Sequence, residues 1–174
     1  NKAKRKSNNI LVSVYINPKQ FGSHLDFKKY PRSLSKDIRL LQKKKVKYLY
    51  IPNRKDIYSF RTKSNIFLDK FSQKLCGKFR PNHFKGVIDV VNRFLEIIRP
   101  KFMYLGMKDY QQITLIKSHI KKNNINTKIK ICSTIREKNG VALSSRNIKL
   151  NGNQMKIAAK ICKYLKINKK KILL

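Results

Sequence analysis

The alternation of short apolar segments with longer segments of helical periodicity constrains the fold of this chain more than any other feature. The apolar segments have the length of buried β-strands and lie at 10–16, 46–51, 100–105 and 129–132. The first ends at Asn17-Pro18 and the second at Pro52-Asn53, where proline prevents a central strand from continuing. Strands that alternate with helices are typical of a parallel sheet with right-handed crossovers. The sequence therefore predicts an α/β fold in which helices flank a parallel sheet.

Apolar residues recur at intervals of three and four between and after these segments, which indicates amphipathic helices. The clearest predicted face consists of Val87, Val90, Val91, Phe94, Ile97 and Ile98. Three further faces are predicted from Leu34, Ile38 and Leu41, from Ile113, Ile116 and Ile120, and from Ile157, Ala158, Ile161 and Leu165. The segment 56–74 has no clear period, and we expect a loop, a short strand and a turn of helix there.

The stretch Tyr104–Gln112 joins the third predicted strand to a helix that is expected to begin near Tyr110. Gly106 lets the backbone come close to a ligand, and Lys108 adds a compact positive charge beside a helix N-terminus. Ligands of α/β folds bind at the carboxyl ends of parallel strands, so this turn suits a phosphate group. Gln112 offers donors and an acceptor that suit a polar substrate. Such turns are also common without a ligand, so this stretch alone leaves both interpretations open.

Two other polar segments allow both a functional and a purely structural interpretation. Ser144-Ser145-Arg146 follows the turn signal Asn139-Gly140, and two hydroxyls beside an arginine can hold phosphate oxygens. A segment of this composition is more often a solvated loop. Asn17 and Gln20 stand at the exit of the first predicted strand, where their amides can bind a substrate or close an ordinary turn.

The charge balance is extreme, with 43 Lys and Arg residues against 8 Asp and Glu residues and a net charge of +35. Such a charge is typical of proteins that bind nucleic acids or anionic membranes. The lysines are scattered, however, and the runs 43–45 and 169–171 have no interleaved aromatic residues. Lys, Asn and Ile are enriched together, as an A/T-rich coding bias produces on tolerant surfaces. We therefore expect no specific nucleic-acid partner.

Cysteine, histidine and apolar content narrow the class of protein further. No segment approaches the ~20 apolar residues of a membrane span, so we expect no membrane partner. Cys76, Cys132 and Cys162 are odd in number and show no C-x-x-C spacing, and the histidines form no ligand motif. The sequence predicts neither a disulfide framework nor a zinc site, and a reducing cytoplasm is the expected location.

Five segments resemble, in order and spacing, motifs of the pantoate–β-alanine ligase family: INPKQF, YPRSLSKD, RPNHFKGV, GMKDYQQ and GVALSSRN. The resemblance runs from Ile10 to about Ala159 and implies a Rossmann-like domain of the nucleotidyltransferase superfamily. That domain is expected over 1–150, with a helix at 151–174 that leads toward a C-terminal domain. The resemblance also implies that ATP activates pantoate as a pantoyl-adenylate, which β-alanine converts to pantothenate with release of AMP. It implies a homodimer in the complete enzyme.

The functional residues of the family carry over onto matching positions of this sequence. Gln20 and Gln112 match two glutamines that bind pantoate, and the first of them also contacts β-alanine. The predicted ATP-binding residues are Gly106, Met107, Lys108, Asp109, Ile135, Leu143, Ser144, Ser145 and Arg146. Lys108 is the predicted catalytic residue, because with Ser144 and Arg146 it would neutralise the phosphates as charge develops. Mg²⁺ would be held mainly by the triphosphate, and no residue is predicted as a metal ligand.

Three departures from the family pattern bear on these expectations. The upstream H-x-G-H-type loop and the C-terminal domain have no counterpart, so we expect a fragment that is inactive alone. Cys76 replaces the acidic residue of Leu-Glu-Gly, and Asn82 replaces the glycine of R-P-G-H-F. Arg80 and His83 are therefore left out of the predicted site. The alternatives are another nucleotidyltransferase of the same superfamily and, less favoured, a basic nucleic-acid-binding module.

Overall fold

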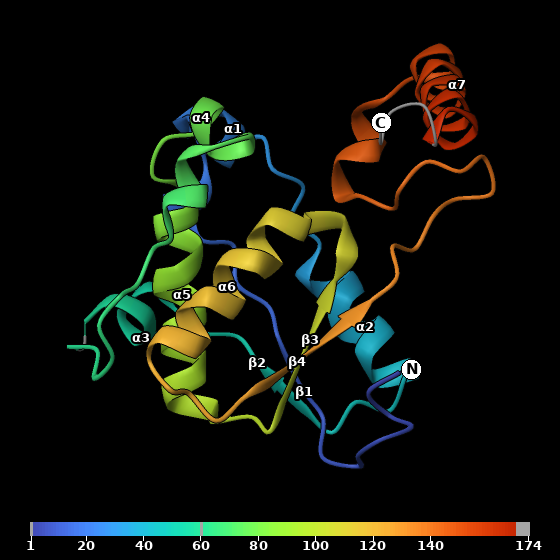
Figure 1. Cartoon of the computed structure of the whole chain (residues 1–174). Coiled ribbons are helices and arrows are strands. Elements are labelled where there is room, and N and C mark those ends of the chain that lie inside the picture. The colour runs from blue at the N-terminus through green and yellow to red at the C-terminus, as the bar shows by residue number, and fades with distance from the viewer. Residues whose placement is uncertain (1, 60, 170–174) are drawn as a thin grey trace. The chain divides into compact units, whose positions relative to one another are not determined.

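The chain forms two compact units in a computed structural model that describes residues 2–59 and 61–169. Unit 1 spans Asn1–Cys132 and unit 2 spans Ser133–Leu174. Figure 1 shows the strands and helices of unit 1, which are β1 (Leu11–Ser13), α1 (His24–Lys28), α2 (Leu34–Lys43), β2 (Tyr48–Tyr50), α3 (Arg54–Tyr58), α4 (Cys76–Phe79), α5 (His83–Ile98), β3 (Phe102–Gly106), α6 (Tyr110–Lys122) and β4 (Lys128–Cys132). Unit 2 contains α7 (Gly152–Ile167). The 3-10 helices are η1 (Pro18–Gln20), η2 (Lys70–Gln73), η3 (Met107–Asp109) and η4 (Ser145–Lys149).

The strands of unit 1 form two parallel pairs, which confirms the parallel pairing predicted from the alternation of strands and helices. Leu11 lies opposite Tyr48 in the first pair, and Gly106 lies opposite Cys132 at the end of the second. No ladder among the described strands joins β1 or β2 to β3 or β4, so the expected single sheet is present as two separate pairs. Ladder bonds depend on which backbone lies alongside a strand, and the composition of a strand does not specify that neighbour.

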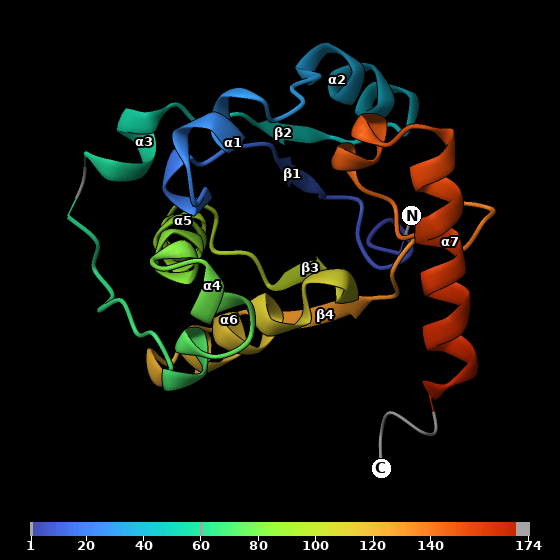
Figure 2. The same ribbon diagram turned by 90° about the horizontal axis from the view of Figure 1, so that it is seen from above.

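Helices α5 and α6 pack on the β3–β4 pair and enclose the main core, as Figures 1 and 2 show. Phe84, Val87 and Ile88 from α5 pack with Leu115 and Ile116 from α6, and all five are at most 5% exposed. The strand residues that pack against this cluster are Met103, Leu105 and Ile129. The turn between β3 and α6, where the phosphate site is predicted, therefore joins two elements of the same core.

The buried face of α5 differs in part from the predicted one. Val87 and Val90 are buried as predicted, but Ile97 is 43% exposed. The additional buried apolar residues are Phe84, Ile88 and Leu95. Apolar residues surround much of this helix, so their spacing predicts the helix correctly but does not determine which side the neighbouring elements cover.

Two other predicted faces form helices without contributing to a core. Leu34 of α2 is 43% exposed, and no residue of that helix is buried. Ile157, Ile161 and Leu165 of α7 are each more than half exposed. The ambiguous segment 56–74 contains the end of α3 and the whole of η2, and the short strand expected there is not found among its described residues.

A buried polar network joins α6 to α5 and to the segment that precedes η2. His119 is fully buried, and its Nδ1 accepts a hydrogen bond from the Phe67 backbone N–H at 3.2 Å. Nε2 therefore carries the ring hydrogen and donates to Asn92 Oδ1 at 2.9 Å. The Asn92 amide donates to Glu96 Oε1, which also accepts the Lys63 backbone N–H at 2.8 Å. Burial lowers the pKa of His119 below its ordinary value of 6.5, because a buried imidazolium is poorly solvated.

We expect the free energy of unfolding to fall as the pH is lowered from about 7 to about 5, because His119 is held neutral in the folded chain. Folding lowers its pKa, so its contribution is present above the unfolded pKa of 6.5 and is lost as the pH falls toward the folded pKa. One such group changes the free energy by at most about 1.4 kcal/mol per pH unit. Urea denaturation at several pH values measures the free energy of unfolding. This free energy should change less with pH in His119→Gln than in the wild type. Parallel curves would contradict this prediction.

Candidate functional site

The turn between β3 and α6 presents Lys108 at the carboxyl end of a strand. β3 ends at Gly106, η3 follows, and α6 begins at Tyr110. A Cβ atom on Gly106 would meet no heavy atom within 4 Å, so packing within the chain does not require glycine there. Lys108 Nζ donates to Asp109 Oδ1 at 2.8 Å, and the two side chains are 45% and 55% exposed. The turn is therefore open and carries an accessible cation, which is compatible with the predicted phosphate site.

The two adjacent glutamines in the first turn of α6 have different surroundings. Gln111 is 8% exposed, and its Nε2 donates to the backbone oxygens of Phe71 at 2.9 Å and Lys74 at 2.7 Å. Its Oε1 accepts the Cys76 backbone N–H at 3.2 Å. Gln112 is half-buried, and its side chain makes no hydrogen bond to the part of the chain that the structure describes. Gln111 therefore anchors a loop, whereas the amide of Gln112 is available to a ligand.

The 3-10 helix η1 places Gln20 against the first turns of α5. Asn17 precedes η1 and is 1% exposed, with Nδ2 donating to the Gly86 backbone oxygen at 2.9 Å and Oδ1 accepting the Tyr58 hydroxyl at 2.7 Å. Burial raises the pKa of Tyr58 to about 12, so this hydroxyl remains a donor at neutral pH. The Gln20 side chain makes no hydrogen bond within the described residues. The side-chain amide of Asn17 is therefore hydrogen-bonded inside the protein. The side-chain amide of Gln20 is available to a ligand.

Two residues that sequence reasoning left out of the site hold the backbone of Gln20. Arg80 Nη2 donates to the Gln20 backbone oxygen at 2.9 Å, and His83 Nδ1 lies 2.6 Å from the same oxygen. Asn82 has a φ of 62°, in the left-handed region that glycine and asparagine tolerate best. Asparagine therefore suits the left-handed backbone at the position where the family pattern has glycine. The bond from Cys76 to α6 is made by its backbone, so it does not depend on an acidic side chain there.

A short hairpin in unit 2 brings Ile135 and Leu143 together. Arg136 pairs with Ala142 in an isolated antiparallel bridge, and the Leu143 N–H donates to the Ile135 backbone oxygen at 2.9 Å. Gly140 has a φ of 89° in the turn, as the Asn-Gly signal predicts. Ile135 is 70% exposed and Leu143 is 55% exposed. These two predicted ATP contacts therefore lie opposite each other on the surface of unit 2.

The predicted Ser-Ser-Arg segment continues directly from this hairpin. Ser144 caps η4, because its Oγ accepts the Arg146 backbone N–H at 3.2 Å. The Asn147 amide donates to Glu137 Oε1 at 2.7 Å and to the Ala142 backbone oxygen at 3.1 Å, which ties η4 to the hairpin. Unit 2 thus gathers Ile135 and residues 143–146 in one local structure, whereas unit 1 holds Gln20, Gln112 and residues 106–109. The ligand contacts of both groups stay predictions.

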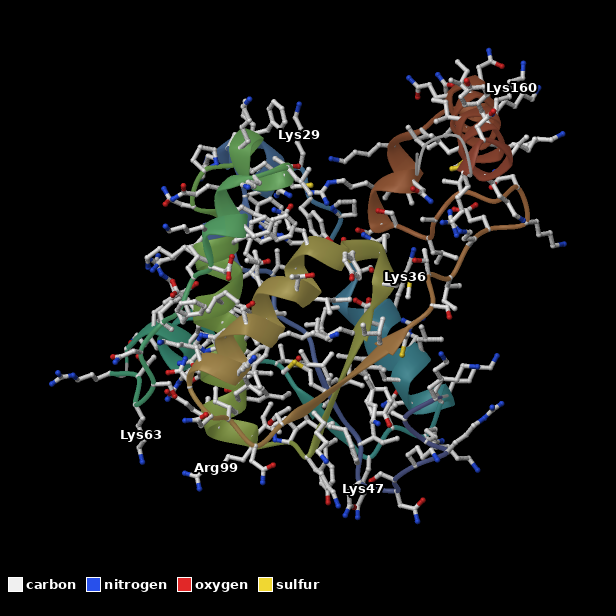
Figure 3. All side chains as sticks on the ribbon, viewed as in Figure 1. Lys29, Lys36, Lys47, Lys63, Arg99 and Lys160 are labelled. Atoms are coloured by element: carbon white, nitrogen blue, oxygen red, sulfur yellow. The ribbon has the colours of Figure 1, made fainter. Side chains whose placement is uncertain are left out.

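The positive charge of the chain is distributed over its surface. Figure 3 shows Lys29, Lys36, Lys47, Lys63 and Arg99 at separate places on unit 1. In residues 2–59 and 61–169, no group of three or more His, Cys, Asp or Glu side chains is arranged to hold a metal ion. No helix of this part of the chain has the length and apolar character needed to cross a membrane. These labelled cations lie on different elements of unit 1.

Parallel strand pairs, flanking helices and a lysine at a strand-to-helix turn define a Rossmann-like α/β protein of the nucleotidyltransferase type. The family model described as Pantoate-beta-alanine ligase matches residues 1–172 of the sequence. The chain belongs to the pantoate-beta-alanine ligase family.

Individual relatives agree with this assignment. Pantothenate synthetase of Thermoanaerobacter sp. (strain X514) is 39% identical over 171 residues, which are 98% of this chain and 60% of that protein. The enzyme of Francisella tularensis subsp. novicida (strain U112) is 41% identical over 169 residues, covering 95% of this chain and 64% of that protein. The chain therefore spans less than two thirds of the length of these relatives.

Solved structures of the family superimpose closely on this chain. The crystal structure of pantoate-beta-alanine ligase from Francisella tularensis, complexed with beta-gamma ATP and beta-alanine, gives a TM-score of 0.86 at 41% identity. The match covers 95% of this chain and 64% of the Francisella chain. Pantothenate synthetase from Thermus thermophilus gives a TM-score of 0.87 at 34% identity, covering 94% of this chain and 60% of that protein. These likenesses confirm the expected α/β fold class.

Proposed function

We propose that this chain supplies the pantoate-binding and most of the ATP-binding residues of a ligase that joins (R)-pantoate to β-alanine. The observation that carries the proposal is the family match over residues 1–172, which contains all five motifs in order. The Francisella structure that this chain resembles was solved with beta-gamma ATP and beta-alanine, so a relative at 41% identity binds beta-alanine and an ATP analogue. The alternative of another nucleotidyltransferase has no comparable support.

The proposed reaction has two steps, adenylation of pantoate and amide formation with β-alanine. A carboxylate oxygen of pantoate attacks the α-phosphorus of ATP, and the bond to the leaving diphosphate breaks. The neutral amine nitrogen of β-alanine then attacks the acyl carbon of the pantoyl-adenylate. The bond from this carbon to the AMP oxygen breaks, and the nitrogen releases a proton to solvent as the amide of pantothenate forms. Charge on the leaving diphosphate develops only in the first step, which is where a cation beside the β- and γ-phosphates accelerates the reaction.

The available side chains suit these roles. Gln20 and Gln112 would bind pantoate, and Gln20 would also contact β-alanine, as the family resemblance implies. Both side-chain amides make no hydrogen bond within the described residues, which leaves them available for this role. Lys108 would stabilise the phosphates from the open β3–α6 turn. The remaining predicted ATP contacts are Gly106, Met107, Asp109, Ile135, Leu143, Ser144, Ser145 and Arg146.

Three further properties belong to the same proposal. Mg²⁺ would neutralise phosphate charge and be held mainly by the triphosphate, as such ions usually are in nucleotide sites. The complete enzyme would be a homodimer, as the family resemblance implies. The reaction would take place in the cytoplasm, where cysteines such as the free Cys76, Cys132 and Cys162 stay reduced. The family domain over 1–150 and the helix beyond it remain the expected division.

The proposal is tested with the 174-residue chain and with a chimera. In the chimera, this chain replaces the segment of the Francisella enzyme that it matches, and the rest of that enzyme is kept unchanged. We expect the chain to bind pantoate and ATP in calorimetry without turning them over, and the chimera to release AMP only when both pantoate and β-alanine are present. The Francisella remainder without this chain is the control. Absence of pantoate binding by the chain would overturn the proposal.

We expect any binding of DNA by this chain to be weak, independent of sequence and steeply sensitive to salt. The +35 charge is scattered, so DNA phosphates would be contacted by many separate lysines. The affinity would then come from the release of counterions from the DNA, which salt opposes. Several such contacts lower affinity by about 10³-fold or more between 50 and 200 mM salt. Fluorescence anisotropy with unrelated oligonucleotides at several salt concentrations measures this. A preferred oligonucleotide bound tightly at physiological salt would instead support the nucleic-acid alternative.

A further inference from the structure

Arg80 and His83 converge on one backbone atom, the carbonyl oxygen of Gln20. Arg80 Nη2 donates to this oxygen at 2.9 Å, and His83 Nδ1 lies 2.6 Å from it. Because a carbonyl oxygen only accepts hydrogen bonds, His83 Nδ1 carries the hydrogen of this contact. Arg80 Nη1 lies 3.5 Å from His83 Nε2, so the guanidinium, the imidazole and the carbonyl form a closed set of polar contacts.

The surrounding contacts connect this arrangement to the core of unit 1. The His83 ring packs edge-on against Phe84 with ring centroids 4.9 Å apart, and Phe84 belongs to the main core. The Gln20 N–H donates to the Asn17 backbone oxygen at 3.1 Å. A Cβ atom on Gly86 would lie 2.7 Å from a backbone oxygen of η1, so α5 and η1 are in close contact. The backbone N–H and the backbone oxygen of Gln20 are therefore both hydrogen-bonded. The side-chain amide of Gln20 makes no hydrogen bond within the described residues.

We propose that Arg80 and His83 are positioning residues for pantoate, because they hold the Gln20 carbonyl and thereby orient the Gln20 amide. The inference rests on the proposed function, in which that amide binds pantoate. Two donors on one carbonyl oxygen restrain rotation of the peptide plane, so the Cα–Cβ direction from which the Gln20 side chain extends is set before the substrate arrives. A group that is already oriented loses less entropy when it binds, and affinity rises accordingly.

Substitutions at His83 separate the donor from the ring. His83→Phe keeps a ring against Phe84 and removes the donor, whereas His83→Asn keeps an N–H near the position of Nδ1. Calorimetry on the 174-residue chain should show pantoate binding weakened about 3- to 10-fold in His83→Phe, the range of one net hydrogen bond. ATP affinity should be unchanged, and His83→Asn should restore most of the pantoate affinity. Arg80→Ala should behave like His83→Phe, and Arg80→Lys should restore part of the loss.

A double-mutant cycle tests whether His83 acts through Gln20. In a Gln20→Ala background, His83→Phe should cause no further loss of pantoate affinity, because there is no amide left to orient. Lys85→Ala is the matched control, since Lys85 is exposed on the first turn of α5 and pairs only with Asp89 in the described structure. Additive losses in the cycle would overturn the inference. Equal losses of pantoate and ATP affinity would also overturn it, because they would show a general effect on folding.

The two proposals fail in distinguishable ways. If the wild-type chain does not bind pantoate, the proposed function fails, and the role of the Gln20 amide fails with it. If the wild type binds pantoate and His83→Phe binds it equally well, only the positioning role is wrong. Thermal unfolding of each variant identifies any that does not fold, and the conservative pair His83→Asn and Arg80→Lys then provides the comparison with the wild type.

Discussion

Lys108→Ala in the chimera is expected to slow diphosphate release by about 10²- to 10³-fold, the usual cost of removing one preorganised donor. Adenylation builds negative charge on the phosphates as the carboxylate of pantoate attacks. Lys108 is exposed at the end of β3, on a turn fixed by the core that α5 and α6 form. Its Nζ lies 2.8 Å from Asp109 Oδ1, so the cation is at the turn in the structure without a nucleotide. Stabilisation that is stronger in the transition state than in bound ATP lowers the barrier of this step.

The second half-reaction should be affected much less by the same substitution. Diphosphate has left before β-alanine attacks the pantoyl-adenylate, so less charge forms near the distal phosphate positions. Two single-turnover assays on Lys108→Ala measure diphosphate release from ATP and amide formation from supplied pantoyl-adenylate. Lys117→Ala is the matched control, because Lys117 is an exposed lysine of α6 outside the predicted site. Equal losses in both assays would mean that Lys108 only holds the nucleotide or the turn.

Gln20→Ala and Gln112→Ala are each expected to weaken pantoate binding about 5- to 150-fold while leaving ATP binding unchanged. Each substitution leaves a polar group of the substrate without a partner, at a cost of roughly 1–3 kcal/mol. Calorimetry with pantoate and with ATP separately, on the chain and on both variants, measures the two affinities. A rise in the dissociation constant for ATP alone would show that the glutamine concerned is assigned to the wrong substrate.

Gln111→Ala provides a matched comparison with Gln112→Ala, one residue away on the same helix. Gln111 bonds the backbone of Phe71, Lys74 and Cys76, so its loss should lower stability by about 1–3 kcal/mol. Gln112 makes no such bonds within the described residues, so Gln112→Ala should change stability by at most about 0.5 kcal/mol. Urea denaturation separates the two effects, and comparable destabilisation by both variants would contradict the distinction.

The identity of the two glutamines shows how far local sequence information extends. Gln111 and Gln112 are chemically the same residue, and the GMKDYQQ motif selects Gln112 only through its match to a family. The structure separates them physically, because the helix turns Gln111 toward the loop 71–76 and leaves Gln112 half-buried. The partners of Gln111 lie 35 to 40 residues away along the chain, so no local pattern predicts that contact.

The sequence by itself determined the features that depend on neighbouring residues. Helical spacing predicted α5 and α6, and five motifs indicated the family. Apolar segments predicted β1 and β2, but β1 is shorter than predicted and ends at Ser13, before Asn17-Pro18. These features are local, because strand and helix periods and turn conformations are set by residues close together in the chain. The family motifs likewise depend only on the order of residues.

Only the tertiary structure decided which side of α5 is buried, that Asn17 bonds Gly86, and that Arg80 and His83 meet the carbonyl of Gln20. These contacts span 60 or more residues along the chain, apart from the packing of α5 itself. A hydrogen bond to a backbone oxygen does not depend on the side chain of the accepting residue, so it leaves no pattern in the sequence. Such contacts become visible only when packing has brought distant segments to within about 3 Å of each other.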